Sequence, residues 1–192
     1  MIRRLGPADY RAMPWRNGLG TTTELFVHPA GGSLETGFLL RVSRAPVVAD
    51  GPFSAFPGID RSLLLLEGGG LALDHGPHGA QVLARPLEPV RFSGDWPTTG
   101  RLLGGACLDF GVMSRREGCS HELRVVVPGP GGAPLPPGDL RLVYCARGAA
   151  TVAGEGLEAG ACLVLEGGAA QAAGDADLVV VAATWDGRNS RG

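Results

Sequence analysis

The stretch LLLEGGGLAL, Leu64–Leu73, gives the clearest indication of the secondary structure of this chain. Three leucines and a glutamate run into three consecutive glycines, and a second short apolar segment follows at once. A short apolar run is typical of a buried strand, and a glycine cluster is typical of a turn. The leucine run is too short and too close to the glycines for a helix, so the stretch predicts a strand, a turn and another strand.

The same alternation of short strand and turn continues along the whole chain, and no window has a long helical period. Each predicted strand is apolar or alternating and is bounded by turn residues. Many short strands with Gly/Pro turns favour an all-β sandwich or barrel. The predicted strands are Thr22–Val27, Phe38–Val42, Ser62–Leu66, Leu71–Leu73, Val90–Phe92, Leu108–Met113, Leu123–Val127, Leu140–Tyr144, Gly148–Val152, Cys162–Leu165 and Leu178–Ala182.

A faint internal repeat indicates two parts. LVYCARGAATVA at Leu142–Ala153 repeats the strand–turn–strand pattern of Leu64–Leu73. PGPGGAPLPPG at Pro128–Gly138 reads as a connector near the join between a larger N-terminal part and a smaller C-terminal part. Two related β-rolls in tandem would account for the repeat.

Composition excludes several classes of function. The formal net charge is -2 with both signs scattered along the chain, whereas nucleic-acid binding shows as a clustered basic excess. We therefore expect no nucleic-acid partner. The chain contains no lysine, so a Schiff-base lysine is ruled out. The glycine-rich Gly18–Thr22 also lacks the lysine of a phosphate-binding loop.

Other patterns point to a cytoplasmic protein without metal or cofactor. No apolar stretch reaches the roughly 18 residues that span a membrane, and MIRRLGPADY lacks the apolar run of a signal peptide. His75 and His78 lie in a Gly/Pro turn that we expect to be solvated, without a third metal ligand nearby. We expect buried, reduced thiols at the four widely spaced cysteines, Cys107, Cys119, Cys145 and Cys162.

Charged residues recur among the apolar positions of at least three predicted strands. Alternate side chains of a strand share a face, so Glu24 shares one with Thr22, and Arg41 shares one with Ser43. In the same way, Asp109 shares a face with Met113 and Arg115. An outward, solvated face is the simpler interpretation for any one of them. Taken together they also fit a pocket, because an arginine fork beside hydroxyls and an aromatic ring suits a carboxylate.

Four stretches resemble the HutD/Ves family. They are MPWRNGLGTTTEL at Met13–Leu25, LLRVSRAPVVADGPFSAFPGIDRSLLLLEGGGLAL at residues 39–73, FSG at Phe92–Gly94 and DFGVMSRR at Asp109–Arg116. The resemblance implies a bicupin, with two RmlC-like jelly-roll β-barrels in tandem and no cupin metal histidines. It also implies a link to histidine utilisation, with formylglutamate or urocanate as proposed ligands. We place an N-terminal roll at residues 1–120 and a smaller C-terminal roll at 121–192.

The resemblance also implies a pocket in the first roll. This sequence departs from the family pattern at Leu19, Thr23 and Gly111, where the family usually has glycine, a basic residue and asparagine. The sequence leaves open whether these departures alter the ligand specificity of the family. The pocket residues carried over by motif are Trp15, Asn17, Thr22, Glu24, Arg41, Ser43, Phe53, Ser54, Phe56, Arg61, Met113 and Arg115.

Three functions are compatible with this sequence. The leading one is a metal-free cupin that binds a small anionic metabolite and regulates histidine utilisation, with Arg41 and Arg61 pairing with the ligand carboxylate. The second is a metal-independent isomerase or hydrolase in which Glu24 is the general acid or base. The third is a protein-interaction module. The sequence leaves open whether the protein is a monomer or a homodimer.

Overall fold

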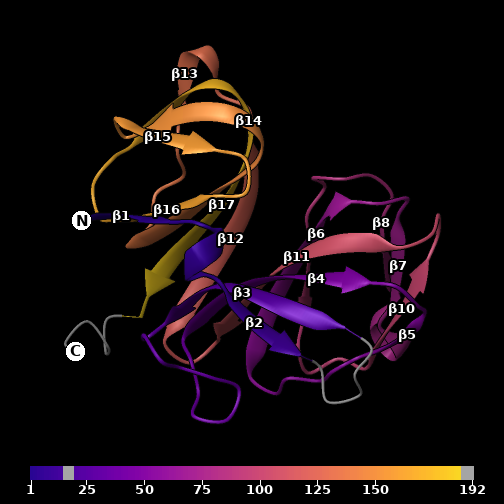
Figure 1. Ribbon diagram of the computed structural model, residues 1–192. Coiled ribbons are helices and arrows are strands. Elements are labelled where there is room, and N and C mark those ends of the chain that lie inside the picture. The colour runs from indigo at the N-terminus through magenta and orange to yellow at the C-terminus, as the bar shows by residue number, and fades with distance from the viewer. Residues whose placement is uncertain (15–19, 187–192) are drawn as a thin grey trace. The chain divides into compact units, whose positions relative to one another are not determined.

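The computed structural model describes residues 1–14 and 20–186, and in them the predicted all-β fold is confirmed. Besides seventeen strands, the described part contains two short 3-10 helices, η1 (Pro7–Asp9) and η2 (Gly76–His78) (Figure 1). The chain divides into two compact units. One unit is Arg11–Gly118, and the other combines Met1–Tyr10 with Cys119–Gly192.

The Arg11–Gly118 unit is built from two antiparallel sheets. The six-stranded sheet has the order β2-β3-β4-β11-β6-β9. Its strands are β2 (Arg11–Pro14), β3 (Thr21–His28), β4 (Leu40–Val47), β11 (Cys107–Arg115), β6 (Ile59–Glu67) and β9 (Val90–Ser93). The four-stranded sheet, in the order β5-β10-β7-β8, contains β5 (Gly51–Phe53), β10 (Thr98–Leu102), β7 (Leu71–Asp74) and β8 (Ala80–Leu83).

The LLLEGGGLAL stretch carries the chain from one of these sheets to the other. Its first half ends β6 and its second half forms β7, so the predicted strand, turn and strand are confirmed. Gly68 has φ +116, and a Cβ there would lie 2.3 Å from the Cβ of Cys107. The turn therefore requires glycine at this position.

The core of this unit lies between the two sheets. Leu63 and Leu65 of β6 pack in one apolar cluster with Leu71 and Leu73 of β7. All four are almost completely buried, and burying one leucine side chain contributes roughly 1.5–3 kcal/mol. The face of the six-stranded sheet that carries Leu63 and Leu65 is called the inner face below.

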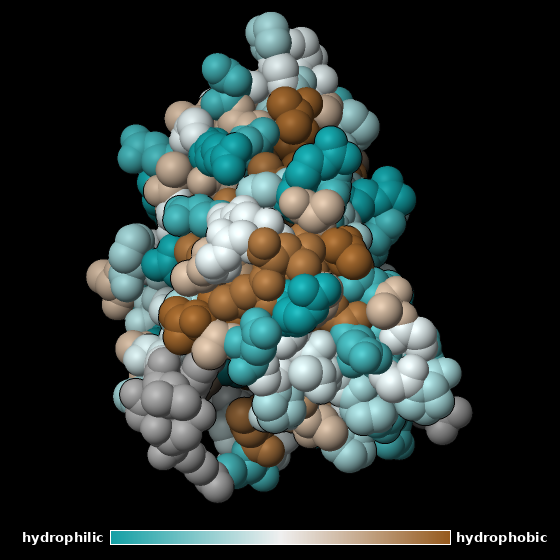
Figure 2. All heavy atoms as spheres, turned by 90° about the vertical axis from the view of Figure 1, so that its right-hand side faces the viewer, coloured by the Kyte–Doolittle hydropathy of each residue, from teal (hydrophilic) through white to brown (hydrophobic). Residues whose placement is uncertain are grey.

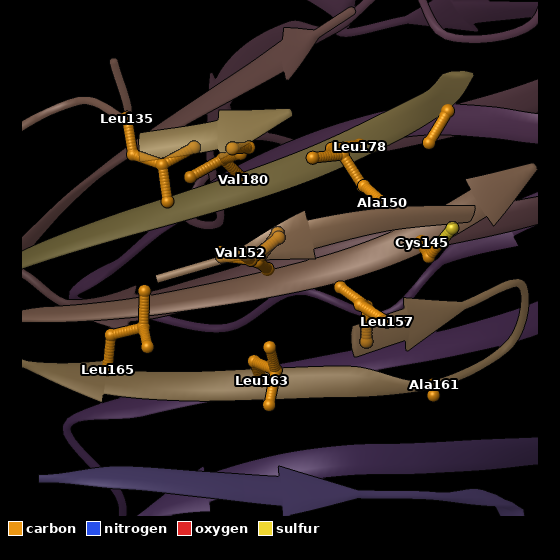
Figure 3. Close-up of a cluster of buried hydrophobic side chains, with 13 residues drawn as sticks. Leu135, Cys145, Ala150, Val152, Leu157, Ala161, Leu163, Leu165, Leu178 and Val180 are labelled. Carbon is orange, nitrogen blue, oxygen red and sulfur yellow. The ribbon is translucent and has the colours of Figure 1, made fainter. Parts of the chain in front are cut away.

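The second unit is organised around one seven-stranded antiparallel sheet with the path β1-β16-β14-β17-β12; β13 pairs with β17, and β15 with β14. Figure 3 shows its core, where Leu178 and Val180 of β17 lie among apolar side chains from β14, β15 and β16. The strands are β1 (Ile2–Leu5), β12 (Cys119–Val126), β13 (Gly129–Pro134), β14 (Leu140–Val152), β15 (Glu155–Glu158), β16 (Cys162–Glu166) and β17 (Gln171–Trp185).

The two units share one local arrangement of strands. In the first, β6 lies between β11 and β9; in the second, β14 lies between β17 and β16. The pairing of β6 with β11 skips Leu66, and the pairing of β14 with β17 skips Ala146. A one-residue bulge thus occurs at the same place in both central strands.

The division into units differs from the expected one in two places. Met1–Tyr10 belongs with the C-terminal unit, because β1 pairs with β16 from Ile2↔Leu165 to Leu5↔Cys162. The expected connector Pro128–Gly138 contains a strand, β13, which pairs with β17. Prolines are tolerated there because β13 is an edge strand and needs few backbone donors.

On the surface, hydrophilic side chains surround a hydrophobic band on the face shown in Figure 2. Within the described residues no helix has the length and apolar character needed to cross a membrane. The exposed large hydrophobic residues of the described part belong to both units: Met1, Ile2, Leu34, Val48, Val82, Leu103 and Val127.

Candidate functional site

Strand register gathers buried charges on the inner face of the six-stranded sheet. Arg41 of β4, Met113 of β11 and Arg61 of β6 are direct cross-strand neighbours. Asp109 lies four residues before Met113 on β11, so it points to the same side. Glu24 of β3 opposes Ser43 of β4. We call Glu24, Arg41, Arg61 and Asp109 the buried charge cluster; each is at most 8% exposed.

Glu24 and Arg41 form a buried ion pair. Arg41 Nε donates to Glu24 Oε2 at 2.8 Å, and the side chains are 5% and 7% exposed. Arg41 Nη2 lies 3.9 Å from the Met13 sulfur. Burying an unpaired carboxylate is costly, so this contact explains how Glu24 can lie among apolar neighbours. It also means that Arg41 is already neutralised by a carboxylate within the protein.

Arg61 is buried in a different way, among aromatic rings. Its Cζ lies 5.5, 5.4 and 5.0 Å from the ring centroids of Phe53, Phe56 and Phe92, within the range of cation–π attraction. Its Nη1 donates to the carbonyl oxygen of Ser54 at 3.2 Å. Among the described residues no carboxylate lies within ion-pair distance of Arg61. Burial lowers the pKa of Arg61 to about 10, against the attraction of Asp109.

Asp109 is the titratable member of the cluster. Its Oδ1 accepts a hydrogen bond from the backbone N–H of Ala45 at 3.0 Å. Burial raises the pKa of Asp109 to about 7, although Arg61 and the Ala45 hydrogen bond favour the charged form. A carboxyl group with this pKa exchanges its proton near neutral pH. With Asp109 protonated, the cluster of two arginines and one remaining carboxylate carries a net positive charge.

The structure brings together most of the pocket residues expected from the sequence. Met113, Ser43, Phe53 and Phe56 surround the buried charge cluster as described above, whereas Ser54 contributes its carbonyl oxygen and is itself exposed. Thr22 lies on β3 opposite Met13. Arg115 is further along β11, where its Nε donates to the Phe38 carbonyl oxygen at 3.0 Å. The expected pocket residues Trp15 and Asn17 lie outside the described residues.

Sequence reasoning missed two members of this site. Asp109 shares a strand face with Met113, and alternation along β11 was the available signal. Phe92 opposes Arg61 across β6 and β9; only its place in the Phe92–Gly94 motif marked it. Gly111 also faces inward, since a Cβ there would lie 3.6 Å from Leu63 Cδ1. A side chain at position 111 would therefore project from the inner face of the six-stranded sheet.

The histidine turn is exposed at His78, as expected, and buried at His75. The expectation of a solvated side chain was wrong for His75, which is 1% exposed. Its ring nitrogens lie 2.9 Å from Thr98 Oγ1 and 3.1 Å from Gln81 Oε1. His78 stacks on Trp96 with the ring centroids 4.7 Å apart. These contacts satisfy a buried imidazole and stabilise the turn.

The described residues contain free thiols and no cluster of metal ligands. Within residues 1–14 and 20–186, no group of three or more His, Cys, Asp or Glu side chains could hold a metal ion. The four cysteines are free and buried, as predicted. Burial raises the pKa of the Cys107 thiol to about 11 and that of the Cys119 thiol to about 12, which keeps both protonated near neutral pH.

Comparison with known proteins places the chain in a family. The family model named HutD matches residues 7–181. The chain belongs to the HutD family. HutD from Pseudomonas fluorescens, solved in a formate condition, is 27% identical with a TM-score of 0.84, covering 97% of this chain and 100% of that one. A conserved protein of unknown function from Pseudomonas aeruginosa is 29% identical with a TM-score of 0.83, covering 96% of this chain and 99% of that one.

More distant solved structures share the fold of this HutD-family chain. The bacterial pirin YhhW from Escherichia coli, in complex with nickel(II), is 12% identical, with a TM-score of 0.67 over 94% of this chain and 98% of that one. At this identity the likeness concerns the fold alone, which is all-β and cupin-like.

Proposed function

We propose that this HutD-family protein is a metal-independent bicupin that binds a small carboxylate metabolite, formylglutamate- or urocanate-like, and moderates histidine utilisation. The tandem arrangement is supported by the bulge and flanking strands that β6 and β14 have in common. Family membership supports the cupin-like fold and the choice of ligands to test. The fold alone does not fix a function. The chemistry of the ligand is therefore inferred from the residues of the site.

The proposal rests on the burial of Arg61 without an ion-pair partner among the described residues. This arginine is a buried cation whose hydrogen bond goes to a neutral carbonyl oxygen. Arg41, by contrast, is paired with Glu24. A guanidinium presents donors in a planar fork that matches a carboxylate. A ligand carboxylate at Arg61 would form the direct ion pair that no carboxylate of the described residues forms with it, Asp109 acting on it only at longer range.

The rest of the site divides into an apolar and a polar side. The rings of Phe53 and Phe56 beside Arg61 suit the apolar part of a metabolite. Ser43 and the Glu24–Arg41 pair supply fixed polar groups next to it. HutD from Pseudomonas fluorescens was solved in a formate condition, and formate, the smallest carboxylate, is therefore included among the probes.

A thermal-shift screen with N-formylglutamate, urocanate and formate tests the proposal. Ligand at 100 times Kd stabilises the native state by about 2.7 kcal/mol. We expect stabilisation of the wild type, and loss of that response in Arg61→Gln. Arg101→Gln, which changes an exposed arginine of the same unit, is the matched control and keeps the response. Absence of stabilisation by every probe, or an unchanged response in Arg61→Gln, contradicts the proposal.

A metal-independent isomerase or hydrolase is the second candidate, and Asp109 favours it. General acid–base catalysis works best with a group whose pKa lies near the working pH. The pKa of Asp109 is about 7, whereas Glu24, the candidate from the sequence, is held by Arg41. Turnover of urocanate or N-formylglutamate followed by NMR tests this candidate. It requires measurable turnover in the wild type and loss of turnover in Asp109→Asn.

A further inference from the structure

Arg141 on β14 is a third buried arginine of the described residues, besides Arg41 and Arg61, and the proposed function does not use it. It is 1% exposed, and its Nη2 donates to the carbonyl oxygen of Gly167. Its Nε is the one buried side-chain nitrogen or oxygen of the described residues that lacks a hydrogen-bond partner. No carboxylate of the described residues forms an ion pair with it. Leaving such a donor unpaired in the interior is costly, so it calls for an explanation.

Strand register makes Arg141 the counterpart of Arg61. The residue just before the bulge is Leu65 on β6 and Cys145 on β14. Each arginine lies four residues before it. Arg61 stands between Met113 and Phe92 on the neighbouring strands.

In the same way, Arg141 stands between Ala182 of β17 and Leu165 of β16. It shares a strand face with Val143 and Cys145, which belong to the core of Figure 3. Each arginine also donates to a backbone carbonyl oxygen.

The surroundings of Arg141 lack the countercharge found in the first unit. The position that corresponds to Asp109 is Leu178, which pairs with Cys145. The position that corresponds to Arg41 is Glu122, opposite Ala182, and its Oε1 accepts from Arg124 Nε at 2.6 Å. The Glu122 side chain is 48% exposed. Burial lowers the pKa of Arg141, as expected for a cation without a buried anion.

We infer that the second unit contains its own anion site, in which the guanidinium of Arg141 takes the carboxylate of a small ligand through its unpaired Nε–H. The inference rests on the proposed function, because it assigns Arg141 the role proposed for Arg61. The ligand is a small monocarboxylate, since the neighbours at Ala182, Leu165 and Leu178 offer apolar contact and no second cation. A buried water molecule on Nε is the competing occupant.

NMR of the arginine Nε–H groups tests the inference at each site separately. Sodium formate is titrated into the 15N-labelled full chain, with sodium chloride at equal ionic strength as the control. The signals are assigned by their loss in Arg61→Gln and in Arg141→Lys. Lysine is chosen at position 141 because it keeps the buried positive charge, which favours folding of the variant. We expect saturable shifts of both signals with formate alone, and the Arg141 shift persists in Arg61→Gln.

The outcomes separate the two proposals. If the Arg61 signal shifts and the Arg141 signal does not, a bound water or a purely structural arginine explains Arg141, and the inference is wrong while the proposed function stands. If only the Arg141 signal shifts, the inference stands, and the thermal-shift screen with N-formylglutamate and urocanate decides the first site. If neither signal shifts, the inference is wrong, and the same screen decides the proposed function. A response to chloride equal to that to formate also contradicts the inference, because it shows no carboxylate preference.

Discussion

Replacement of Asp109 by asparagine should change how the stability of the protein depends on pH. The carboxyl group has an ordinary pKa of 3.8 when exposed, and burial raises it to about 7 in the folded protein. Between these values the unfolded chain has lost the proton and the folded protein still holds it. The wild type therefore loses stability as pH rises from 4 to 7, and the effect levels off above pH 7.

The magnitude follows from the size of the shift. Each unit of pKa difference corresponds to 1.36 kcal/mol, so the shift of Asp109 amounts to about 4 kcal/mol. Asparagine has the same shape, keeps an oxygen for the Ala45 N–H and does not titrate. Relative to the wild type, Asp109→Asn should therefore gain about 4 kcal/mol in free energy of unfolding between pH 4 and pH 8.

Urea unfolding of both proteins across this pH range measures the difference. Asp95→Asn is the control, because hydrogen bonds from Ser93, Gly58 and Arg116 hold the pKa of Asp95 below its ordinary value. Asp95 is therefore ionised in both states above pH 5, and its variant should differ from the wild type by a constant amount. An equally constant difference for Asp109→Asn would refute the assignment of a raised pKa to Asp109.

Two further predictions concern what stabilises the fold, both measured by urea unfolding. Glu24→Gln leaves the charge of Arg41 uncompensated and should lower the free energy of unfolding by about 3–5 kcal/mol. The control Glu88→Gln breaks the exposed pair with Arg85 and should lower it by at most about 1 kcal/mol. Equal losses for the two variants would contradict a stabilising buried pair. Leu178→Ala opens a cavity in the core of Figure 3 and should cost about 2–5 kcal/mol. Val82→Ala, at an exposed position, should stay within about 0.5 kcal/mol, and a Leu178→Ala cost that small would place Leu178 outside a packed core.

Much of the fold was predictable because strand and turn chemistry is local. The glycines Gly68–Gly70 indicated a turn, and the apolar runs on either side of them indicated strands. The pairing of β1 with β16 was not predictable, because Ile2–Leu5 contains two arginines and meets its partner about 160 residues later in the chain. The strand within Pro128–Gly138 escaped for a similar reason, since its prolines favour a turn when read locally.

The site was predictable in its residue types and less so in its partners. Alternation on β3 and β4 placed Glu24 and Arg41 on strand faces, but only the register shows that they meet. We expected Arg41 to pair with a ligand carboxylate, whereas in the structure it pairs with Glu24. Asp109 was visible as a charged residue in an apolar strand, whereas its raised pKa depends on its burial in the folded protein. Long-range packing of this kind leaves no mark on a single strand.

A crystal structure of the protein grown with N-formylglutamate and, separately, with urocanate would test directly whether Arg61 binds a ligand. We expect the ligand carboxylate within hydrogen-bond distance of the Arg61 guanidinium, with Phe53 and Phe56 against its apolar part. A ligand bound elsewhere, with Arg61 still donating only to the Ser54 carbonyl oxygen, would contradict this expectation.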